Sequence, residues 1–247
     1  MSNDYPADLY ASLHTGNEGD EEFYRAVCRG AERVVELGCG AGRILMALAD
    51  QVSDLHGVDS SEETLALARA RLPASVTLHQ SDMTTFDVGV GFDRVLIPFN
   101  GIYCLPDIES VRRTFVQAAK ALAPGGLLVF DGYAGDPVHD DEDFEEGFDE
   151  EGEVATVHVR GKECQVFERS HYERAAQRFT VDYRYVANDG EEFLATIRHR
   201  YLRLSEALTA VEDAGLEPLV VHGGFDQSVY EGDSDLMILT AQKRKDG

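Results

Sequence analysis

Hydrophobic and polar positions along the chain follow two periods, and the change between them marks the predicted elements. Short apolar runs predict strands at 33–37, 54–58, 76–80, 92–97 and 126–131, with helical patterns between them. The clearest helix, 107–123, begins at Asp107, which suits capping, and stops at Pro124-Gly125-Gly126. Its apolar face comprises Ile108, Val111, Phe115, Ala118 and Leu122. Strands that alternate with helices indicate an α/β fold with a parallel sheet.

The pattern changes after Tyr133. Residues 139–153 form an acidic run in which Phe144 and Phe148 are almost the only large apolar groups, which is typical of a solvated loop or disordered segment. A mobile lid that closes over a substrate is the alternative. Residues 154–203 alternate with period two and predict three or four antiparallel strands, with a hairpin at 188–190. Ser205 is expected to cap a short helix that ends at Gly215, before strands at 216–222 and 235–242.

Length and composition limit the organisation of the protein. A chain of 247 residues with 43% hydrophobic content suits one large α/β domain with an insertion. No apolar run reaches membrane-spanning length and the N-terminus does not resemble a signal peptide, so we expect a soluble, cytoplasmic protein. The cysteines have no CxxC pair and no His at zinc spacing, so neither a metal nor a disulfide framework is expected; they are Cys28, Cys39, Cys104 and Cys164.

The charge disfavours polyanionic partners. Acidic residues outnumber basic residues 46 to 22, and the net charge of −24 repels nucleic acid and anionic membranes. Lysine occurs only at positions 120, 162, 243 and 245. Two explanations of this lysine-poor, acid-rich composition stay open: a host with a salty cytoplasm, or a GC-rich genome that favours arginine.

A glycine-rich turn follows the first strand, in Glu36-Leu37-Gly38-Cys39-Gly40-Ala41-Gly42-Arg43. Glycines there let the backbone turn sharply and approach a ligand closely before a helix begins. A dinucleotide fingerprint would require a glycine at position 43, which is arginine, and the Gly-Lys-Ser/Thr ending of a P-loop is missing.

Carboxylates stand at the ends of the next two strands. Asp59, in Gly57-Val58-Asp59-Ser60, can accept hydrogen bonds from both ribose hydroxyls of an adenosine, or it can cap the helix that begins near Ser61. Asp82 and Met83 end the third strand, where a carboxylate and a main-chain amide suit an adenine ring. Three consecutive strand ends meet at the edge where open α/β sheets bind ligands.

These motifs, followed in order by F-D-x-V and L-x-P-G-G within residues 34–131, resemble the class I S-adenosylmethionine (SAM)-dependent methyltransferase family. The resemblance implies an α/β, Rossmann-like sheet of seven strands whose last strand is antiparallel, with an antiparallel sheet inserted. It divides the chain into a cap segment and helix (1–32), a SAM-binding core (33–133), an acidic loop with the inserted sheet (134–203) and the end of the core (204–247).

The resemblance also implies the cofactor contacts. The methionine end of SAM would lie against the glycine-rich turn, the ribose at Asp59 and the adenine at Asp82 and Met83, whereas Arg43 is equally suited to a surface helix. The full set of cofactor-binding candidates is Glu36, Gly38, Cys39, Gly40, Gly42, Asp59, Ser60, Asp82, Met83 and Phe99.

Methyl transfer is an in-line displacement that depends on positioning and desolvation and needs no metal. The fourth strand leads into Phe99 and Asn100, which would flank the methyl group, and Asn100 is a catalytic candidate. The segment does not match the Asn/Asp-Pro-Pro-Tyr/Phe motif of base-modifying enzymes, and Asn100 is neutral where metal-dependent catechol enzymes need a carboxylate. Both departures favour a small polar molecule, methylated on nitrogen or oxygen. Tyr103 is a catalytic candidate or a packed helix residue.

An inserted sheet and a segment like 8–14 also resemble small-molecule members such as glycine and amino-sugar N-methyltransferases, where the sheet covers the acceptor or builds a homodimer. Tyr10 and His14 are the catalytic candidates of that segment, and Tyr133, Arg200 and Tyr201 are substrate-binding candidates. Each of them could instead be a packing residue. Two rival functions stay open: a protein or peptide methyltransferase, and a SAM-binding scaffold or regulatory subunit without turnover.

Overall fold

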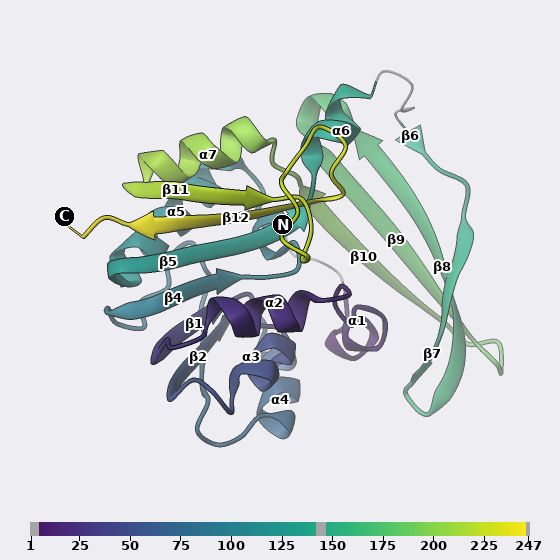
Figure 1. Cartoon of the computed structure of the whole chain (residues 1–247). Coiled ribbons are helices and arrows are strands. Elements are labelled where there is room, and N and C mark those ends of the chain that lie inside the picture. The colour runs from purple at the N-terminus through teal and green to yellow at the C-terminus, as the bar shows by residue number, and fades with distance from the viewer. Residues whose placement is uncertain (1–4, 142–146, 246–247) are drawn as a thin grey trace.

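Two sheets lie side by side in the computed structural model, which describes residues 5–141 and 147–245 (Figure 1). The larger sheet has seven strands in the order β11-β12-β5-β4-β1-β2-β3. Its strands are β1 (Arg33–Leu37), β2 (Asp54–Asp59), β3 (Thr77–Gln80), β4 (Phe92–Ile97), β5 (Leu122–Tyr133), β11 (Leu216–His222) and β12 (Leu236–Lys243). β12 runs antiparallel to both β5 and β11, and the remaining pairs are parallel. The predicted seven-stranded sheet with an antiparallel last strand is confirmed.

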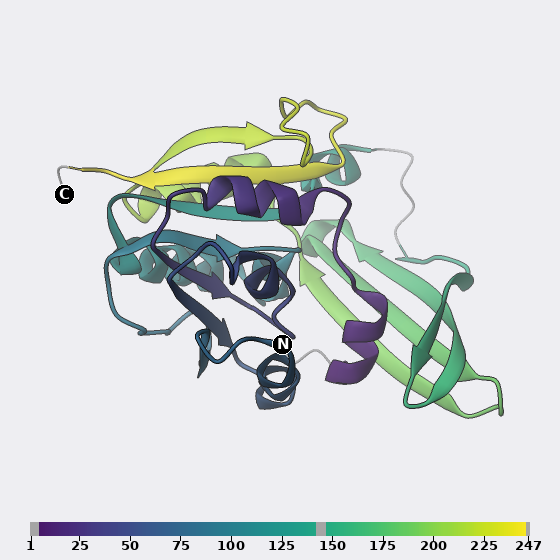
Figure 2. The ribbon, with the colours of Figure 1, turned by 60° about the horizontal axis from the view of Figure 1, so that its bottom comes forward.

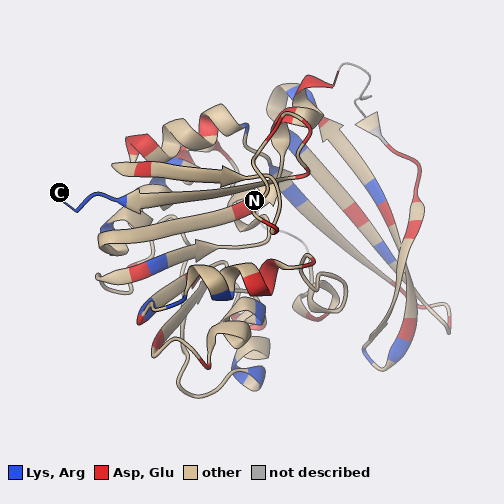
Figure 3. Cartoon of the chain, viewed as in Figure 1, with Lys and Arg blue, Asp and Glu red and all other residues tan. Residues whose placement is uncertain are grey.

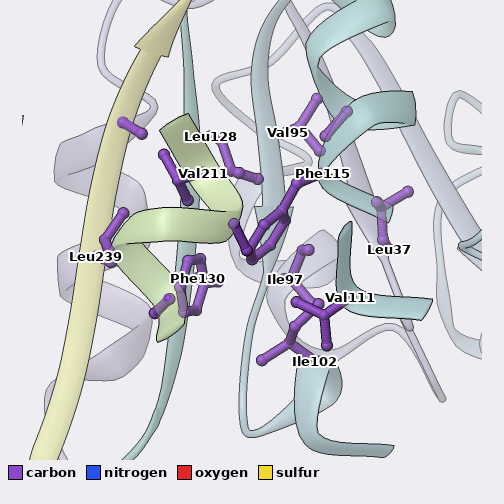
Figure 4. Packing of buried hydrophobic residues seen from close by; sticks show 14 of the residues in the cluster. Leu37, Val95, Ile97, Ile102, Val111, Phe115, Leu128, Phe130, Val211 and Leu239 are labelled. Atoms are coloured by element: carbon purple, nitrogen blue, oxygen red, sulfur yellow. The ribbon is translucent and has the colours of Figure 1, made fainter. Parts of the chain in front are cut away.

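Neighbouring residues of a strand point to opposite faces of the sheet. The strands carry apolar side chains on both faces, and helices cover both. Val34 of β1 packs in one apolar cluster with α2 (Asp20–Val27) and α3 (Arg43–Leu48). Val35, the next residue, packs in the other cluster with α5 (Ile108–Ala121) and α7 (Leu204–Asp213). In that second cluster Phe115 of α5 stacks on Phe130 of β5 with ring centroids 5.2 Å apart (Figure 4). Four of the five residues of the central strand β1 are buried, and this packing holds its carboxyl end, and hence the site, in place.

The second sheet is the predicted insertion. It contains β7 (Gly152–Val159), β8 (Lys162–Glu173), β9 (Arg178–Ala187) and β10 (Glu192–Arg200), all paired antiparallel, with the short β6 (Gly147–Phe148) beside β8. The N-terminal α1 (Ala7–Leu13) lies between this sheet and the core (Figures 1 and 2). Leu9 of α1 is completely buried in a cluster with Val181, Tyr185 and Ile197 of the sheet. The remaining elements are α4 (Glu62–Arg71), α6 (Gly135–Asp140), and the 3-10 helices η1 (Gly101–Cys104) and η2 (Arg174–Ala176).

Two sequence expectations need correction, and a third is confirmed. The helix predicted to end near Pro124 ends at Ala121, and β5 begins at Leu122, so Pro124 lies inside a strand whose register against β4 is irregular. Asp107 does cap this helix, because its Oδ1 accepts a hydrogen bond from the Ser110 amide at 2.7 Å. The short helix after 203 is not capped by Ser205. It begins at Leu204, whose amide donates to Asp136 Oδ2 at 2.7 Å, a carboxylate 68 positions earlier.

The acidic run is more ordered at its ends than the prediction allowed. Its first two residues belong to α6, residues 147–148 form β6, and β7 begins at Gly152. Phe144 and the side chain of Phe148, on which the lid alternative depends, lie outside the described residues. Acidic side chains are spread over the elements of both sheets rather than confined to this run (Figure 3). No helix in the described ranges is long and apolar enough to span a membrane.

Candidate active site

The glycine-rich turn leaves the carboxyl end of β1 at the same edge as the ends of β2, β3 and β4. Gly38, Gly40 and Gly42 have φ of 70°, 54° and 81°, a region that a β-carbon disfavours. The Gly38 and Cys39 amides both donate to the Val58 carbonyl, at 2.8 and 3.0 Å, which ties the turn to β2. Cys39 is buried, so it contributes its backbone to the edge.

Asp59 lies across from this turn. Its Oδ2 accepts a hydrogen bond from the Gly40 amide and its Oδ1 accepts one from the Ser61 amide, both at 2.9 Å. The helix that follows is capped by Ser61, whose Oγ accepts from the Thr64 amide, so Asp59 is not its cap. Burial raises the pKa of Asp59 while the backbone donors oppose that shift. The carboxylate therefore joins two strand ends and keeps lone pairs for a ligand.

The third strand end is close to the first. A β-carbon on Gly38 would lie 3.2 Å from Met83 Cε, so the Met83 side chain reaches the glycine-rich turn. Asp82 is exposed, and its Oδ1 accepts from the Thr84 amide at 2.7 Å. Ser60 is exposed too, and its carbonyl accepts from Gln80. The residues predicted for ribose and adenine thus gather at one edge of the sheet.

Buried carboxylates lie behind the turn. Glu36 is 3% exposed, its Oε2 has no hydrogen-bond partner among the described residues, and burial raises its pKa to about 8. Asp131, at the end of β5, is 1% exposed, and burial raises its pKa to about 6. Asp20 of α2 is also buried and pairs with Arg43 through two contacts of 2.8 and 2.7 Å. One guanidinium thus faces several buried carboxylates, which leaves the region short of positive charge.

Arg43 is not the surface residue that the sequence left open. Besides its pairing with Asp20, its guanidinium lies 5.7 Å from the centroid of the Phe99 ring. Gly16 packs directly on it, because a β-carbon there would come within 2.4 Å of Arg43 Cζ. Arg43 therefore connects α2 to the segment that follows β4.

That segment carries backbone strain. Phe99 and Asn100 have φ of 53° and 60°, values that cost non-glycine residues free energy and persist only where neighbours enforce them. The neighbour is Asp131: its Oδ2 accepts from the Phe99 amide at 2.9 Å and its Oδ1 accepts from the Tyr24 hydroxyl at 2.5 Å. The Asn100 side chain accepts from the Tyr133 amide through Oδ1 at 2.9 Å. A buried carboxylate thus fixes the loop expected beside the methyl group.

His14 lies opposite this loop, with its ring centroid 6.3 Å from Phe99 and 4.4 Å from Tyr10. Its tautomer follows from a chain of hydroxyls. Tyr185 donates to the Leu9 carbonyl at 3.1 Å, so it must accept from Tyr5 at 2.6 Å, and Tyr5 must accept from His14 Nε2 at 3.1 Å. His14 Nδ1 therefore carries the lone pair. Burial lowers the pKa of His14 to about 4, which keeps the imidazole neutral near pH 7.

His199 of β10 is a site residue that the sequence reading missed. Its ring centroid lies 5.9 Å from that of Tyr133 and 6.3 Å from that of Tyr103. Burial lowers its pKa to about 4, with His14 as a further cause, so the two imidazoles are neighbours and neutral. The Tyr133 hydroxyl is buried and has no partner in the described part of the chain. Tyr133 and His199 thus present unpaired polar atoms within an aromatic cluster.

The other predicted residues differ in the hydrogen bonds that their hydroxyl groups make. Tyr10 makes no hydrogen bond through its hydroxyl within the described ranges, and burial raises its pKa, with Asp59 as a smaller cause. Tyr103 is fully buried and donates to the Tyr133 carbonyl at 2.9 Å. Tyr201 is fully buried, and its hydroxyl forms hydrogen bonds with the Tyr172 hydroxyl at 2.6 Å and with Nδ1 of His139 at 2.9 Å.

Arg200 lies on the side of β10 opposite to His199. It pairs with Glu206 at 2.8 Å, while its Nη1 has no partner among the described groups. Of the residues that were missed, Asp131 had a sequence signal, since it ends an apolar strand at the ligand-binding edge. His199 and Tyr24 had none, because their place depends on how the inserted sheet and α2 pack.

Two further observations limit the chemistry and the location of the site. Among the described residues, no group of three His, Cys, Asp or Glu side chains could hold a metal ion. A hollow of about 800 Å³ lies between α2 and the loop that joins β11 to β12, lined by residues such as Glu22, Phe23 and Phe225. It shares no residue with the glycine-rich turn or with Asp59, so we do not assign the cofactor to it.

Comparisons with known proteins agree with this geometry. Residues 34–126 match the model of a methyltransferase domain family. The chain is 30% identical over 131 residues to the dTDP-3-amino-3,4,6-trideoxy-alpha-D-glucopyranose N,N-dimethyltransferase of Streptomyces venezuelae, covering 50% of this chain and 55% of that one. The chain thus spans about half the length of the curated relatives it matches, with 43% coverage of a putative methyltransferase from Geobacillus.

Solved structures cover more of the chain. The CcbJ methyltransferase of Streptomyces caelestis superposes with a TM-score of 0.82 at 26% identity, over 98% of this chain and 97% of that one. SAM-bound CalS10, an amino pentose methyltransferase from Micromonospora echinaspora, gives a TM-score of 0.71 at 27% identity, over 90% and 88% of the two chains. These likenesses show that residues 34–126 form a methyltransferase domain and that the chain is similar over most of its length to solved methyltransferases, one of them with SAM bound.

Proposed function

We propose that this protein transfers a methyl group from SAM to a nitrogen atom of a small polar molecule. The observation that carries the proposal is the juxtaposition of two unlike clusters. Carboxylates and the glycine-rich turn gather at the ends of β1 to β3, and neutral imidazoles and phenols face them from α1 and the inserted sheet. Nitrogen is favoured over oxygen because the relative from Streptomyces venezuelae is named an N,N-dimethyltransferase and CalS10 an amino pentose methyltransferase.

The carboxylates of the cofactor side suit the positive charges and hydroxyl groups of SAM. SAM carries an ammonium and a sulfonium, and the edge offers the unpartnered Oε2 of Glu36 and the carboxylate of Asp131 close behind the turn. Asp59 suits the ribose hydroxyls, since each of its oxygens already accepts one backbone N–H and can accept one more bond. Asp82 and Met83 suit the adenine. When bound, SAM supplies the methyl group.

The acceptor side positions a neutral amine. A primary or secondary amine attacks with its lone pair only when that lone pair is unprotonated, so the neighbouring groups must be neutral and must accept its N–H. His14 meets both conditions, because its Nδ1 has the lone pair and its pKa is about 4. Phe99 and Asn100, fixed by Asp131, lie between the two sides. Holding two reactants in line in this way supplies about 7–11 kcal/mol of the barrier reduction in favourable cases.

Two measurements test the proposal. Calorimetry should detect SAM and its demethylated product but not NADH, and a product-release assay over amines, sugars, carboxylates and phenols should give turnover with amines. SAM binding without turnover in any class would favour the regulatory scaffold, and turnover with basic peptides would favour the peptide enzyme. The absence of heat with both sulfur ligands would refute the cofactor assignment itself.

We further propose a cytoplasmic homodimer that pairs through the inserted sheet and binds neither nucleic acid nor membrane. Support comes from the exposed Leu194 of β10, which is 70% accessible, and from the net charge of −24. Light scattering of the wild type and of Leu194→Lys tests the dimer, since the charge should shift the mass toward that of a monomer. Cell fractionation tests the compartment.

A further inference from the structure

The inserted sheet turns one face toward α1 and the core, and strand pairing defines its residues. Residues directly opposite in an antiparallel pair point to the same side. Glu168 lies opposite Tyr183, and Phe179 lies opposite both Tyr172 and His199. The ring contacts of Tyr183 with His14 and of His199 with Tyr133 show that this side faces the site. We call it the inner face, and its row nearest the core consists of Tyr172, Phe179 and His199.

Glu168 is the carboxylate of this inner face. It is half-buried, and its Oε1 accepts a hydrogen bond from Ser170 Oγ at 3.4 Å. Burial raises the pKa of Tyr183, and the charge of Glu168 together with a hydrogen bond between the two side chains raises it further. It has no ion-pair partner among the described residues. A carboxylate that remains half-buried among aromatic rings without a cation suits a ligand that brings the positive charge or N–H and O–H donors.

Basic side chains of the same strands do not reach this face. Arg169, Arg178, Arg184, Arg198 and Arg200 alternate with the inner residues and therefore point to the outer side. Lys162, the first residue of β8, lies on the inner side of the sheet by alternation. It stands at the end of the strand remote from the core, where it pairs with Asp189 and Glu191. The inner face near the core is thus aromatic and anionic, and it would repel a phosphate.

Two neutral polar groups lie at the core end of the inner face, His199 from β10 and Tyr133 from the end of β5. The Tyr133 hydroxyl is buried and unpartnered, and the ring nitrogens of His199 make no hydrogen bond in the described part of the chain. These atoms can bind hydroxyl or amine groups of a ligand. The surrounding rings can pack on a saturated ring and stabilise a cation over their faces.

We propose that the acceptor is an amine on a saturated ring that carries no phosphate, and that Glu168 selects it. This inference rests on the proposed function and names its substrate class. The amine lone pair forms the N–C bond as the S–C bond breaks, the bonding pair stays on sulfur, and the positive charge moves from sulfur to nitrogen. The resulting ammonium loses its proton to water after release. The relative from Streptomyces venezuelae acts, by its name, on a dTDP-linked sugar, so the two proteins would differ in this respect.

Matched pairs of acceptors test the proposal. Each pair holds one amino sugar as a methyl glycoside and the same sugar as a phosphate ester or linked to dTDP. We expect kcat/KM for the phosphate-free member to exceed that of its partner by about tenfold or more, and Glu168→Gln to reduce this preference by about tenfold because a charged interaction is lost. The matched control is Glu163→Gln on the outer side of the same strand, which removes the same charge and should leave the preference unchanged.

The outcomes separate the two proposals. Preference for the phosphorylated members, or an unaltered preference in Glu168→Gln, would overturn the substrate class while methyl transfer to nitrogen stands. Binding of SAM with no turnover of either member in any pair would contradict the proposed function as well. SAM affinity and thermal unfolding of Glu168→Gln should match the wild type, which excludes misfolding as the cause of a change.

Discussion

The two sides of the proposed site differ in how their residues are brought together and in the charge of their polar groups. The cofactor side uses short segments that each follow a strand, and its polar groups are carboxylates, of which Glu36 and Asp131 are buried with raised pKa values. The acceptor side uses residues from α1, β5, β9 and β10, and its polar groups nearest Phe99 are imidazoles and phenols that burial keeps neutral. Its carboxylate, Glu168 of β8, lies on the inner face of the inserted sheet. A cationic cofactor needs negative charge nearby, whereas the attacking nitrogen needs neutral groups in direct contact with it. The comparison predicts that variants on the cofactor side change SAM affinity and that variants on the acceptor side change turnover.

Asp131→Asn should have the largest effect, because Asp131 serves both sides. An amide in its place would turn an NH₂ group toward the Phe99 amide or the Tyr24 hydroxyl and lose one of the two bonds that fix the strained loop. We expect turnover to fall about 100-fold through misplaced reactants, and the free energy of unfolding to fall by about 1–3 kcal/mol. Steady-state kinetics and urea unfolding measure the two effects. The control is Asp87→Asn, at an exposed turn. Near-wild-type turnover of Asp131→Asn would show that the loop at Phe99 does not position the reactants.

Asp59→Ala should affect the cofactor side alone. Loss of a charged acceptor for the ribose weakens SAM by about 1–3 kcal/mol, while kcat at saturating SAM stays within a few-fold of wild type. Calorimetry and kinetics separate these quantities. Glu63→Ala, exposed in the first turn of α4, is the matched loss of a carboxylate and should bind SAM normally. Unaltered affinity in Asp59→Ala would remove this residue from the site.

Glu36 should make both stability and SAM affinity depend on pH. In the folded protein, burial raises the pKa of Glu36 to about 8, so its carboxyl group stays protonated up to that pH, whereas an unperturbed glutamate has a pKa near 4.5. Between these values the folded state holds more protons, so the contribution of Glu36 to stability is present below pH 4.5 and is lost as pH rises toward 8. If the ammonium of SAM requires ionised Glu36, affinity rises over the same interval and binding releases a proton.

Calorimetry at pH 7 in two buffers of different ionisation enthalpy measures that release. Glu36→Gln should bind SAM more weakly, release no proton and lose the pH dependence of affinity. Equal proton release by Glu36→Gln and wild type would assign the titration to another group. The nearby Asp131, with a pKa of about 6, is largely ionised at this pH and contributes less.

Tyr5→Phe should have the smallest effect and should fall on the acceptor side. It removes the hydroxyl that accepts from His14 Nε2 and donates to Tyr185, so the tautomer of His14 is no longer fixed. We expect kcat to fall a few-fold with SAM affinity unchanged. Tyr230→Phe, whose hydroxyl bonds to Asp136 away from His14, is the control. A loss of SAM affinity in Tyr5→Phe would break the separation between the two sides.

The sequence by itself determined the core sheet and the cofactor side, because both depend on local signals. Apolar runs located β1, β2 and β4 within a residue or so, Asp107 was recognised as a cap, and the glycine-rich turn with Asp59 and Asp82 could be assigned to one edge. Residues that follow neighbouring parallel strands must meet at that edge whatever the rest of the chain does. Their roles as SAM contacts stay predictions.

The acceptor side was decided only by tertiary structure. A cap of α7 at Asp136, the neutral pair of His14 and His199, and the inner position of Glu168 all depend on contacts between segments far apart in the chain. Period-two alternation shows that two faces exist in the inserted sheet, but it does not say which one turns toward the core. Burial also sets the protonation of the histidines, and burial is a property of the packed molecule rather than of any local run of residues.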